Sequence, residues 1–401
     1  MLTTIDPKTG ARNSDRLATV DFARHNEETK RVLDGYYARN PIRVPIQVGT
    51  NTRYFMFHSD ANDFGMDFQR YSEDPDVMFD TMLQFARWSR FNLLQDSELG
   101  LPDRWWVSVD FQNYYEAAWF GCPVEYMDDQ VPDTRPVFQE CPERLLEAGI
   151  PDPFGSLFGK GLEFYDHMVE RSKHEEFLGR PISVGMPGGG TDGPMTVACN
   201  LFGPEFVCTS MIEDPERLQV LLAFITDATI ARMKAWRTKA GSPIPQDGFW
   251  MADDSIALIS TDMVCEQILP HHRRLYDTFG TTKERGLHLC GNATRHFPTL
   301  LRELGIAAFD TGFPVDFGAL RKAVGPDVRI HGGPHIELLR TGTPKAVYEE
   351  SRRILQSGIL DGRMFLLREG NNLAPGTPLE NIEAMVIAGL EFGKYNDETN
   401  D

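Results

Sequence analysis

GLHLCGNATRHFPTLLRELGIAAFD, residues 286–310, is the stretch of sequence that decides the fold. It begins with a short apolar strand pattern at Gly286–Cys290, continues with helical spacing, and ends in a second strand pattern at Ala307–Asp310. Two strands separated by a helix are typical of a parallel sheet, because parallel strands need a long crossover connection. The stretch therefore predicts an α/β protein.

The same alternation extends over most of the chain. The remaining strand patterns are Val44–Gly49, Trp105–Phe111, Ile182–Met186, Gly248–Ala252, Val328–His331 and Met364–Arg368. Eight such units are the number that closes a (β/α)₈ TIM barrel. We therefore predict one barrel domain over residues 1–401, with an N-terminal helical extension at residues 1–40 and an inserted helical segment at residues 112–180.

Helical spacing occurs at residues 13–38 and 75–95, and a further helix is expected from about Gly161 to Lys173; the clearest helix signals lie in the last third of the chain. Thr343-Pro344 is typical of a helix start, and Thr377 is expected to cap the last helix in a capping box.

Composition narrows the class of protein. The 401 residues carry 40 basic and 59 acidic side chains, a net charge of −19, which argues against binding to nucleic acid or to anionic membranes. The six cysteines include no CxxC pair, and no apolar run reaches the length of a membrane span. We expect a cytoplasmic protein that acts on a small molecule, and the sequence leaves a homodimer open.

His288 and Cys290 are the most informative pair of side chains. Residues two apart on a strand point to the same side, so both would lie together at the mouth of the barrel. Zinc takes nitrogen and sulfur ligands and uses three protein ligands in catalytic sites. The alternative is a packed cysteine beside a hydrogen-bonded histidine.

Acidic and amide side chains follow other strands. Glu369 is a candidate metal ligand or base, or else the salt-bridge partner of Arg368, and Asn371 and Asn372 offer amide groups to a ligand. Asp253 and Asp254 follow the strand at Gly248–Ala252. If both point into one cleft, repulsion raises the pKa of one and makes it a proton donor; otherwise one of them caps the next helix.

Further candidates for ligand binding lie in loops after strands. Arg53, beside Tyr54, is suited to hold a carboxylate, unless it forms an ordinary surface ion pair. Gly188, Gly189 and Gly190 are expected to contact ligand or to move as a lid, with simple loop flexibility as the alternative. His335 is a candidate to complete a metal site, although loop histidines commonly have no such role.

Several motifs carry a family resemblance. They are Asp254-Ser255, Ile268-Leu-Pro270, His288-Leu-Cys290-Gly291, Leu338-Leu-Arg-Thr-Gly-Thr-Pro344 and Asn372-Leu-Ala-Pro-Gly-Thr-Pro-Leu-Glu-Asn-Ile382. Over residues 105–392 the chain resembles the uroporphyrinogen decarboxylase superfamily. The resemblance implies a (β/α)₈ barrel and one of two activities: decarboxylation of porphyrinogens, or zinc-dependent methyl transfer between corrinoid proteins and thiols or folates.

The resemblance also implies site residues. His288 and Cys290 look like the first two zinc ligands of the methyltransferases, whose third ligand, a cysteine, falls on Asn371 here. The decarboxylase histidine of that region is absent too, and the N-terminal decarboxylase signature survives only as Arg53-Tyr54. The third ligand would therefore come from Glu369, Asp310 or His335, with Glu369 as first choice.

The leading hypothesis is corrinoid-linked methyl transfer, or demethylation of a small methylated substrate. His288, Cys290 and Glu369 would hold Zn²⁺, Asp254 would move a proton, and a partner protein would supply the corrinoid. One alternative is a metal-free decarboxylase acting on uroporphyrinogen or another carboxylate, with Asp254 and Arg53 at its centre. The other is a non-catalytic barrel that binds a corrinoid or tetrapyrrole.

Overall fold

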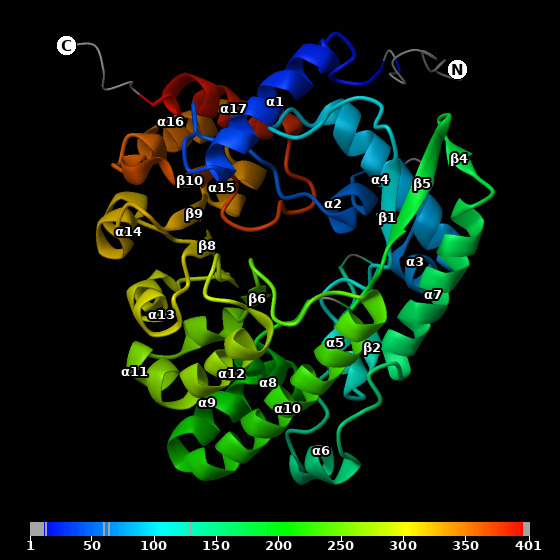
Figure 1. Cartoon of the computed structure of the whole chain (residues 1–401), viewed down its shortest axis with the longest axis vertical. Coiled ribbons are helices and arrows are strands. Elements are labelled where there is room, and N and C mark those ends of the chain that lie inside the picture. Colours follow the sequence, from blue (N-terminus) through cyan, green and yellow to red (C-terminus); the bar gives the residue numbers. More distant parts are fainter. Residues whose placement is uncertain are drawn as a thin grey trace.

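The protein is an α/β barrel, seen here in a computed structural model that describes residues 12, 14–58, 61–62, 65–128, 130–188 and 190–395 (Figure 1). Seven of the eight predicted strands are present. They are β1 (Trp105–Ser108), β5 (Arg180–Gly185), β6 (Trp250–Ala252), β7 (Gly286–Leu289), β8 (Ala308–Thr311), β9 (Arg329–Gly332) and β10 (Phe365–Leu367). The eighth, at Val44–Gly49, is reduced to a single parallel bridge between Ile46 and Leu367.

The strands are parallel and follow the order of a barrel. Five of them form one sheet in the order β10-β9-β8-β7-β6, and β1 pairs with β5. The segment after β5 reaches β6 through a parallel bridge between Asp192 and Ala252. Among the described residues no strand pairing joins the segment around Ile46 to β1, so the hydrogen-bonded ring is open at that point.

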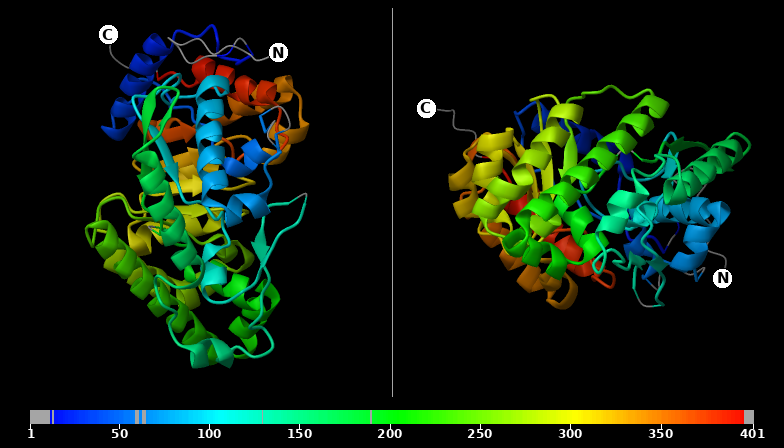
Figure 2. Two further views of the ribbon diagram at one scale, coloured as in Figure 1. Left: turned by 90° about the vertical axis from the view of Figure 1, so that its right-hand side faces the viewer. Right: turned by 90° about the horizontal axis from the view of Figure 1, so that it is seen from below.

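Burial explains why these short runs form strands. All residues of β8 and β10 are buried, as expected for parallel strands that are covered on both faces. The helices that follow the strands supply that cover (Figures 1 and 2). They are α8 (Pro194–Phe202), α9 (Pro204–Glu213), α10 (Pro215–Ala240), α11 (Thr261–Met263), α12 (Leu269–Phe279), α13 (Phe297–Leu304), α14 (Phe317–Val324), α15 (Ile336–Thr341), α16 (Pro344–Leu355) and α17 (Leu379–Phe392).

The N-terminal region is helical and packs against the end of the chain. It contains α1 (Phe22–Tyr37), α2 (Thr52–Met56), α3 (Phe68–Glu73) and α4 (Pro75–Asn92). The helix predicted at residues 75–95 is confirmed, and the one predicted at residues 13–38 is shorter than expected, because α1 begins at Phe22. Figure 1 shows α1 in blue beside the red α17. Arg16, which precedes α1, forms ion pairs with Glu380 and Glu383 of α17.

One helix cap was predicted correctly and another was not. The Thr343 side chain accepts a hydrogen bond from the Ala346 amide at the start of α16, as expected. Thr377 is buried, and its hydroxyl donates to the Ala374 carbonyl instead of capping α17. The buried Thr377 hydroxyl therefore makes a hydrogen bond within the preceding turn, and not the predicted cap at the start of α17.

The insertion between β1 and β5 contains the predicted helix as α7 (Ser156–Ser172). Its other elements are α5 (Tyr115–Trp119), β2 (Val124–Glu125), β3 (Asp133–Thr134), α6 (Glu143–Ala148) and β4 (Glu176–Phe177). Glu116 of α5 ties the insertion to the barrel, because it accepts hydrogen bonds from the Thr191 hydroxyl, the Asp192 amide and the fully buried Arg232 of α10.

Within the described residues no single helix is long and apolar enough to cross a membrane. The pair α8 and α9, which bends by 110°, meets that test only when the two helices are taken together.

Glu116→Gln is expected to destabilise the whole barrel. The substitution leaves the Arg232 guanidinium buried without its counter-charge, which costs about 3 kcal/mol in comparable sites. Urea unfolding measures the loss. As a control, Asp34→Ala breaks the exposed ion pair with Lys30 and leaves the unfolding midpoint unchanged. Equal midpoints for the Glu116 variant and the native protein would contradict this role.

Candidate metal centre

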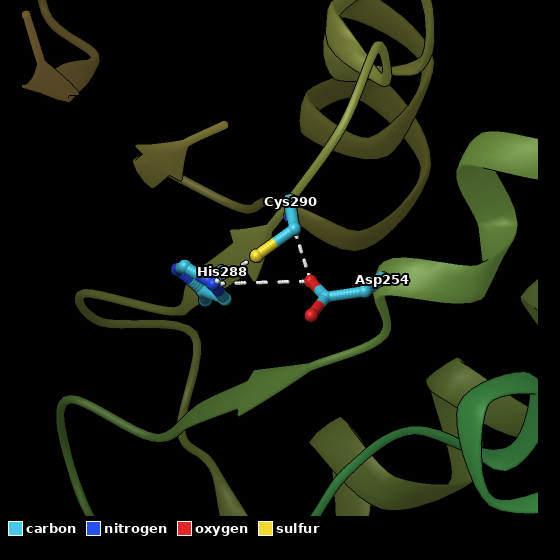
Figure 3. A group of neighbouring side chains, drawn as sticks. All are labelled: Asp254, His288 and Cys290. Atoms are coloured by element: carbon cyan, nitrogen blue, oxygen red, sulfur yellow. Dashed lines mark hydrogen bonds and ion pairs between the residues drawn. The ribbon is translucent and has the colours of Figure 1, made fainter. Parts of the chain in front are cut away.

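Three side chains with metal-binding atoms meet at the carboxyl ends of two neighbouring strands (Figure 3). His288 is on β7, Cys290 follows the end of that strand, and Asp254 follows β6. His288 Nε2 lies 3.0 Å from Cys290 Sγ and 3.8 Å from Asp254 Oδ1. One ligand atom from each residue lies within 4.8 Å of the other two.

Backbone and side-chain bonds hold this arrangement. Asp254 Oδ1 accepts a hydrogen bond of 2.6 Å from the Cys290 amide, which fixes the carboxylate beside the thiol. On the other side of the imidazole, His288 Nδ1 lies 2.8 Å from Asp310 Oδ2. Because an ionised carboxylate can only accept, Nδ1–H donates to Asp310 and Nε2 is left facing Cys290 and Asp254.

The electrostatic environment of the cluster is acidic. Burial lowers the pKa of His288, but the hydrogen bond and charge of Asp310, with the charge of Asp254, outweigh it and raise that pKa overall. Burial also raises the pKa of the Cys290 thiol far above its usual range, and Asp254 adds to the shift. Without a cation the sulfur therefore stays protonated at neutral pH.

The donor set fits a zinc ion. An imidazole nitrogen, a thiol sulfur and a carboxylate oxygen are the three ligand types that zinc prefers in proteins. Three protein ligands would leave a position open for a substrate, as in catalytic zinc sites. Asp254 is 39% exposed and His288 24% exposed, so the cluster is accessible from one side.

Glu369, the first choice for the third metal ligand from the sequence, does not lie with His288 and Cys290 in the metal-binding cluster. Glu369 is fully buried, and its two oxygens accept hydrogen bonds from the Gly49 amide, each at 3.0 Å. Its Oε1 also accepts from Arg368 at 2.8 Å, so the salt-bridge alternative describes it correctly. The carboxylate beside His288 and Cys290 is Asp254.

The neighbouring carboxylates Asp253 and Asp254 do not share a cleft. Asp253 is fully buried; its Oδ1 accepts from the amide and hydroxyl of Thr196 at 2.7 and 2.8 Å, and its Oδ2 lies 2.6 Å from His272 Nε2. It makes no side-chain cap to the following helix either. Asp253 therefore holds α8 and α12 together, and the catalytic role predicted for it is not supported.

Arg53 and Tyr54 separate in the structure although they are adjacent in the sequence. Tyr54 lies in the core and its hydroxyl donates to the Thr377 carbonyl at 2.7 Å, which corrects the prediction that it contacts substrate. The Nε of Arg53 is buried and has no hydrogen-bond partner among the described residues. Burial lowers the pKa of Arg53, and the charge of Asp110 acts to raise it. Asp110 Oδ2 accepts a hydrogen bond of 2.8 Å from the hydroxyl of Thr52, the residue before Arg53.

The remaining loop candidates differ in their surroundings. His335 Nδ1 accepts from the Glu337 amide and the ring packs on Phe313, so this histidine caps α15 and does not join the metal cluster. Asn371 has a positive φ of 143° and its Oδ1 accepts from the amide of the exposed Asn372. Contact of these asparagines with a ligand stays a prediction.

The glycine-rich loop borders a cavity. Gly188 has a φ of +84°, and a Cβ there would come within 2.4 Å of Trp236, so only glycine fits. Gly188 and Gly190 both line the cavity, and Gly189 lies outside the described residues.

Asp192 is a residue of the site that the sequence did not reveal. Burial, followed by the charge of Glu116, raises its pKa strongly, and Asp254 and His288 are among the charges that act on it. In the sequence it comes just after the glycine-rich loop, six residues beyond the end of the strand predicted at Ile182–Met186.

Comparisons with known proteins agree on the fold. The sequence model of the family described as uroporphyrinogen decarboxylase (URO-D) matches residues 25–391. The structure of a methyltransferase from Methanosarcina mazei is similar with a TM-score of 0.60 at 20% identity, over 91% of this chain and 98% of that chain. At this identity the likeness shows the fold alone.

A B12-independent methionine synthase from Shewanella sp. W3-18-1, solved in complex with selenomethionine, is more distant. Its TM-score is 0.34 at 13% identity, over 68% of this chain and 74% of that chain. No curated protein sequence matches the chain.

Asp253→Ala and Asp254→Ala are expected to have different effects on stability. Removing the Asp253 carboxylate leaves Thr196 and His272 without a buried partner, a loss of about 2–3 kcal/mol, whereas the partly exposed Asp254 gives up one hydrogen bond worth about 1 kcal/mol. Urea unfolding of the two variants makes the comparison. A larger loss for Asp254→Ala would contradict the assignment of Asp253 as structural.

Proposed function

The chain belongs to the uroporphyrinogen decarboxylase family, and we propose that it acts there as a methyltransferase, in corrinoid-linked methyl transfer or demethylation of a small methylated substrate. The observation that carries the proposal is the cluster of Asp254, His288 and Cys290. Its donor atoms suit zinc, and the same fold occurs in the Methanosarcina mazei methyltransferase.

In this proposal the three ligands have different tasks. A bound zinc ion would supply a Lewis acid that lowers the pKa of a thiol or water at its open position. His288 offers Nε2 because Asp310 holds the proton on Nδ1. Cys290 has to lose its proton from Sγ before it can bind a metal, and the Asp254 oxygens beside it are placed to accept that proton.

Arg53 and Asp254 complete the reaction site. The guanidinium of Arg53 is partly buried, and its Nε has no hydrogen-bond partner among the described residues. It would hold an anionic group of the substrate beside the metal ligands. Asp254 keeps a solvent-facing oxygen and would pass protons between the site and water.

Arg53 is also the feature that favours the second candidate, metal-free decarboxylation of a carboxylate. In the described part of the chain the buried Nε of Arg53 has no hydrogen-bond partner, so this partly buried cation is suited to hold a substrate carboxylate. In that reaction Cys290 would have no task, and its substitution would leave turnover intact.

Methyl transfer from methylcobalamin to 2-mercaptoethanol, followed by the spectrum of the corrinoid, tests the proposed function. Zinc-loaded protein is expected to catalyse the transfer, and Cys290→Ser to lower the rate at least 100-fold, because the site then lacks the sulfur ligand that Cys290 supplies. Cys141→Ser is the matched control, since Cys141 is exposed. Equal activity of the Cys290 variant, or of metal-free protein, would contradict the proposal.

Asp310→Asn is expected to weaken zinc binding by about 10- to 100-fold, as loss of the partner of a metal-ligating histidine commonly does. Competition with a chromogenic chelator measures the affinity. Asp316→Asn is the control: Asp316 caps α14, and asparagine caps equally well. An unchanged affinity in Asp310→Asn would show that this carboxylate does not orient His288 for metal.

A further inference from the structure

A cavity of about 190 Å³ lies at the carboxyl ends of β1 and β5, the same edge of the barrel as the metal cluster. It is bounded by the loop after β1, the glycine-rich loop after β5, and helices α5, α7 and α10. The residues that matter for its shape are Phe111, Tyr115, Phe158, Gly161, Gly188 and Trp236.

Four aromatic side chains, Phe111, Tyr115, Phe158 and Trp236, contribute to the walls of the cavity, together with the polar Asp110 and Gln112. Tyr115 and Phe158 meet edge to face with centroids 5.6 Å apart, and Phe158 and Trp236 lie 5.8 Å apart at 50°. Aromatic pairs prefer such edge-to-face and tilted contacts, so these rings offer matching surfaces to another ring. The absence of a side chain at Gly161 leaves room in the cavity, and at Gly188 it lets Trp236 pack against the glycine-rich loop, where a Cβ would lie within 2.4 Å of the ring.

The size of the cavity limits its occupant. An apolar cavity of about 150 Å³ is known to bind benzene, so about 190 Å³ accommodates one six-membered ring with a small substituent. A tetrapyrrole is several times too large for this space.

The cavity lies next to the metal cluster. Gly190 lines it, and Asp192, two residues further on, pairs with Ala252, which lies two residues before Asp254. Asp110 lines it as well, and its Oδ2 accepts a hydrogen bond of 2.8 Å from the hydroxyl of Thr52, the residue before Arg53. A ring in the cavity would therefore have its substituents close to Arg53 and the metal ligands.

We propose that this cavity holds an aromatic ring of the substrate, which makes the substrate a small monocyclic aromatic compound. The further statement that this ring carries the transferred methyl group rests on the proposed function. The binding of an aromatic ring in the cavity is independent of that function. An aliphatic compound of the same size would fill the volume without the edge-to-face contacts that the four rings provide.

Calorimetric titration with methoxybenzene tests the proposal, with methoxycyclohexane as the aliphatic comparison. Metal-free protein and Cys290→Ser are used, so binding is measured independently of methyl transfer. Methoxybenzene is expected to bind at one site, at least 10-fold more tightly than methoxycyclohexane. Absence of methoxybenzene binding, or equal binding of both compounds, would overturn the proposal while leaving the metal site untouched.

Two variants and one control test whether methoxybenzene binds in this cavity. Gly161→Leu fills the cavity and is expected to weaken methoxybenzene binding at least 10-fold; its Cβ would lie 3.5 Å from Phe111, an ordinary contact, so the fold has room for it. Glu163→Leu, which puts the same side chain on the exposed side of α7, leaves binding unchanged. Tyr115→Leu removes one aromatic wall and is expected to reduce the preference for methoxybenzene over methoxycyclohexane. Unaltered binding in Gly161→Leu, or an unaltered preference in Tyr115→Leu, would place the ligand elsewhere.

Discussion

The hydrogen bond between His288 and Asp310 is the interaction on which the candidate centre depends. Because neighbouring strands β7 and β8 are parallel and in register at these residues, the imidazole and the carboxylate meet side by side. The bond places the histidine proton on Nδ1 and leaves Nε2 for the cysteine and for a metal. The β6–β7 pairing then brings Asp254 to the other side of the thiol.

The carboxylate charges around the same cluster favour the binding of a cation. Asp254 and Asp310 both act on His288 and Cys290, and Arg368 forms ion pairs with Asp310 and with the buried Glu369. A thiol in such a place gains little by ionising alone, because its charge would face carboxylates. A divalent ion would reverse that balance and favour the thiolate. The protonation state of the Cys290 thiol is therefore expected to depend on whether a metal is bound.

The order of strands could be predicted from the sequence because each one is a short apolar run bounded by loop residues, and His288 and Cys290 could be paired because they lie two apart on one strand. The third ligand could not be predicted in this way. Glu369 is close in sequence to the position where related enzymes carry their ligand, but the Gly49 amide and Arg368 hold it in the core. Asp254 and Asp253 are identical in type and adjacent, and only the packing of Thr196 and His272 around Asp253 decides which of them faces the site. Which carboxylate faces the site is thus decided by contacts between residues far apart in the chain, and these contacts are not visible in the local sequence.

Zinc K-edge X-ray absorption of the zinc-loaded protein tests the central claim most directly. We expect one zinc–sulfur distance of about 2.3 Å, from Cys290, and zinc–nitrogen or zinc–oxygen distances of about 2.0–2.2 Å, from His288, Asp254 and the open position. The sulfur signal should disappear in Cys290→Ser. A spectrum with no sulfur, or with two or more, would contradict the assignment of Asp254, His288 and Cys290 as the metal centre.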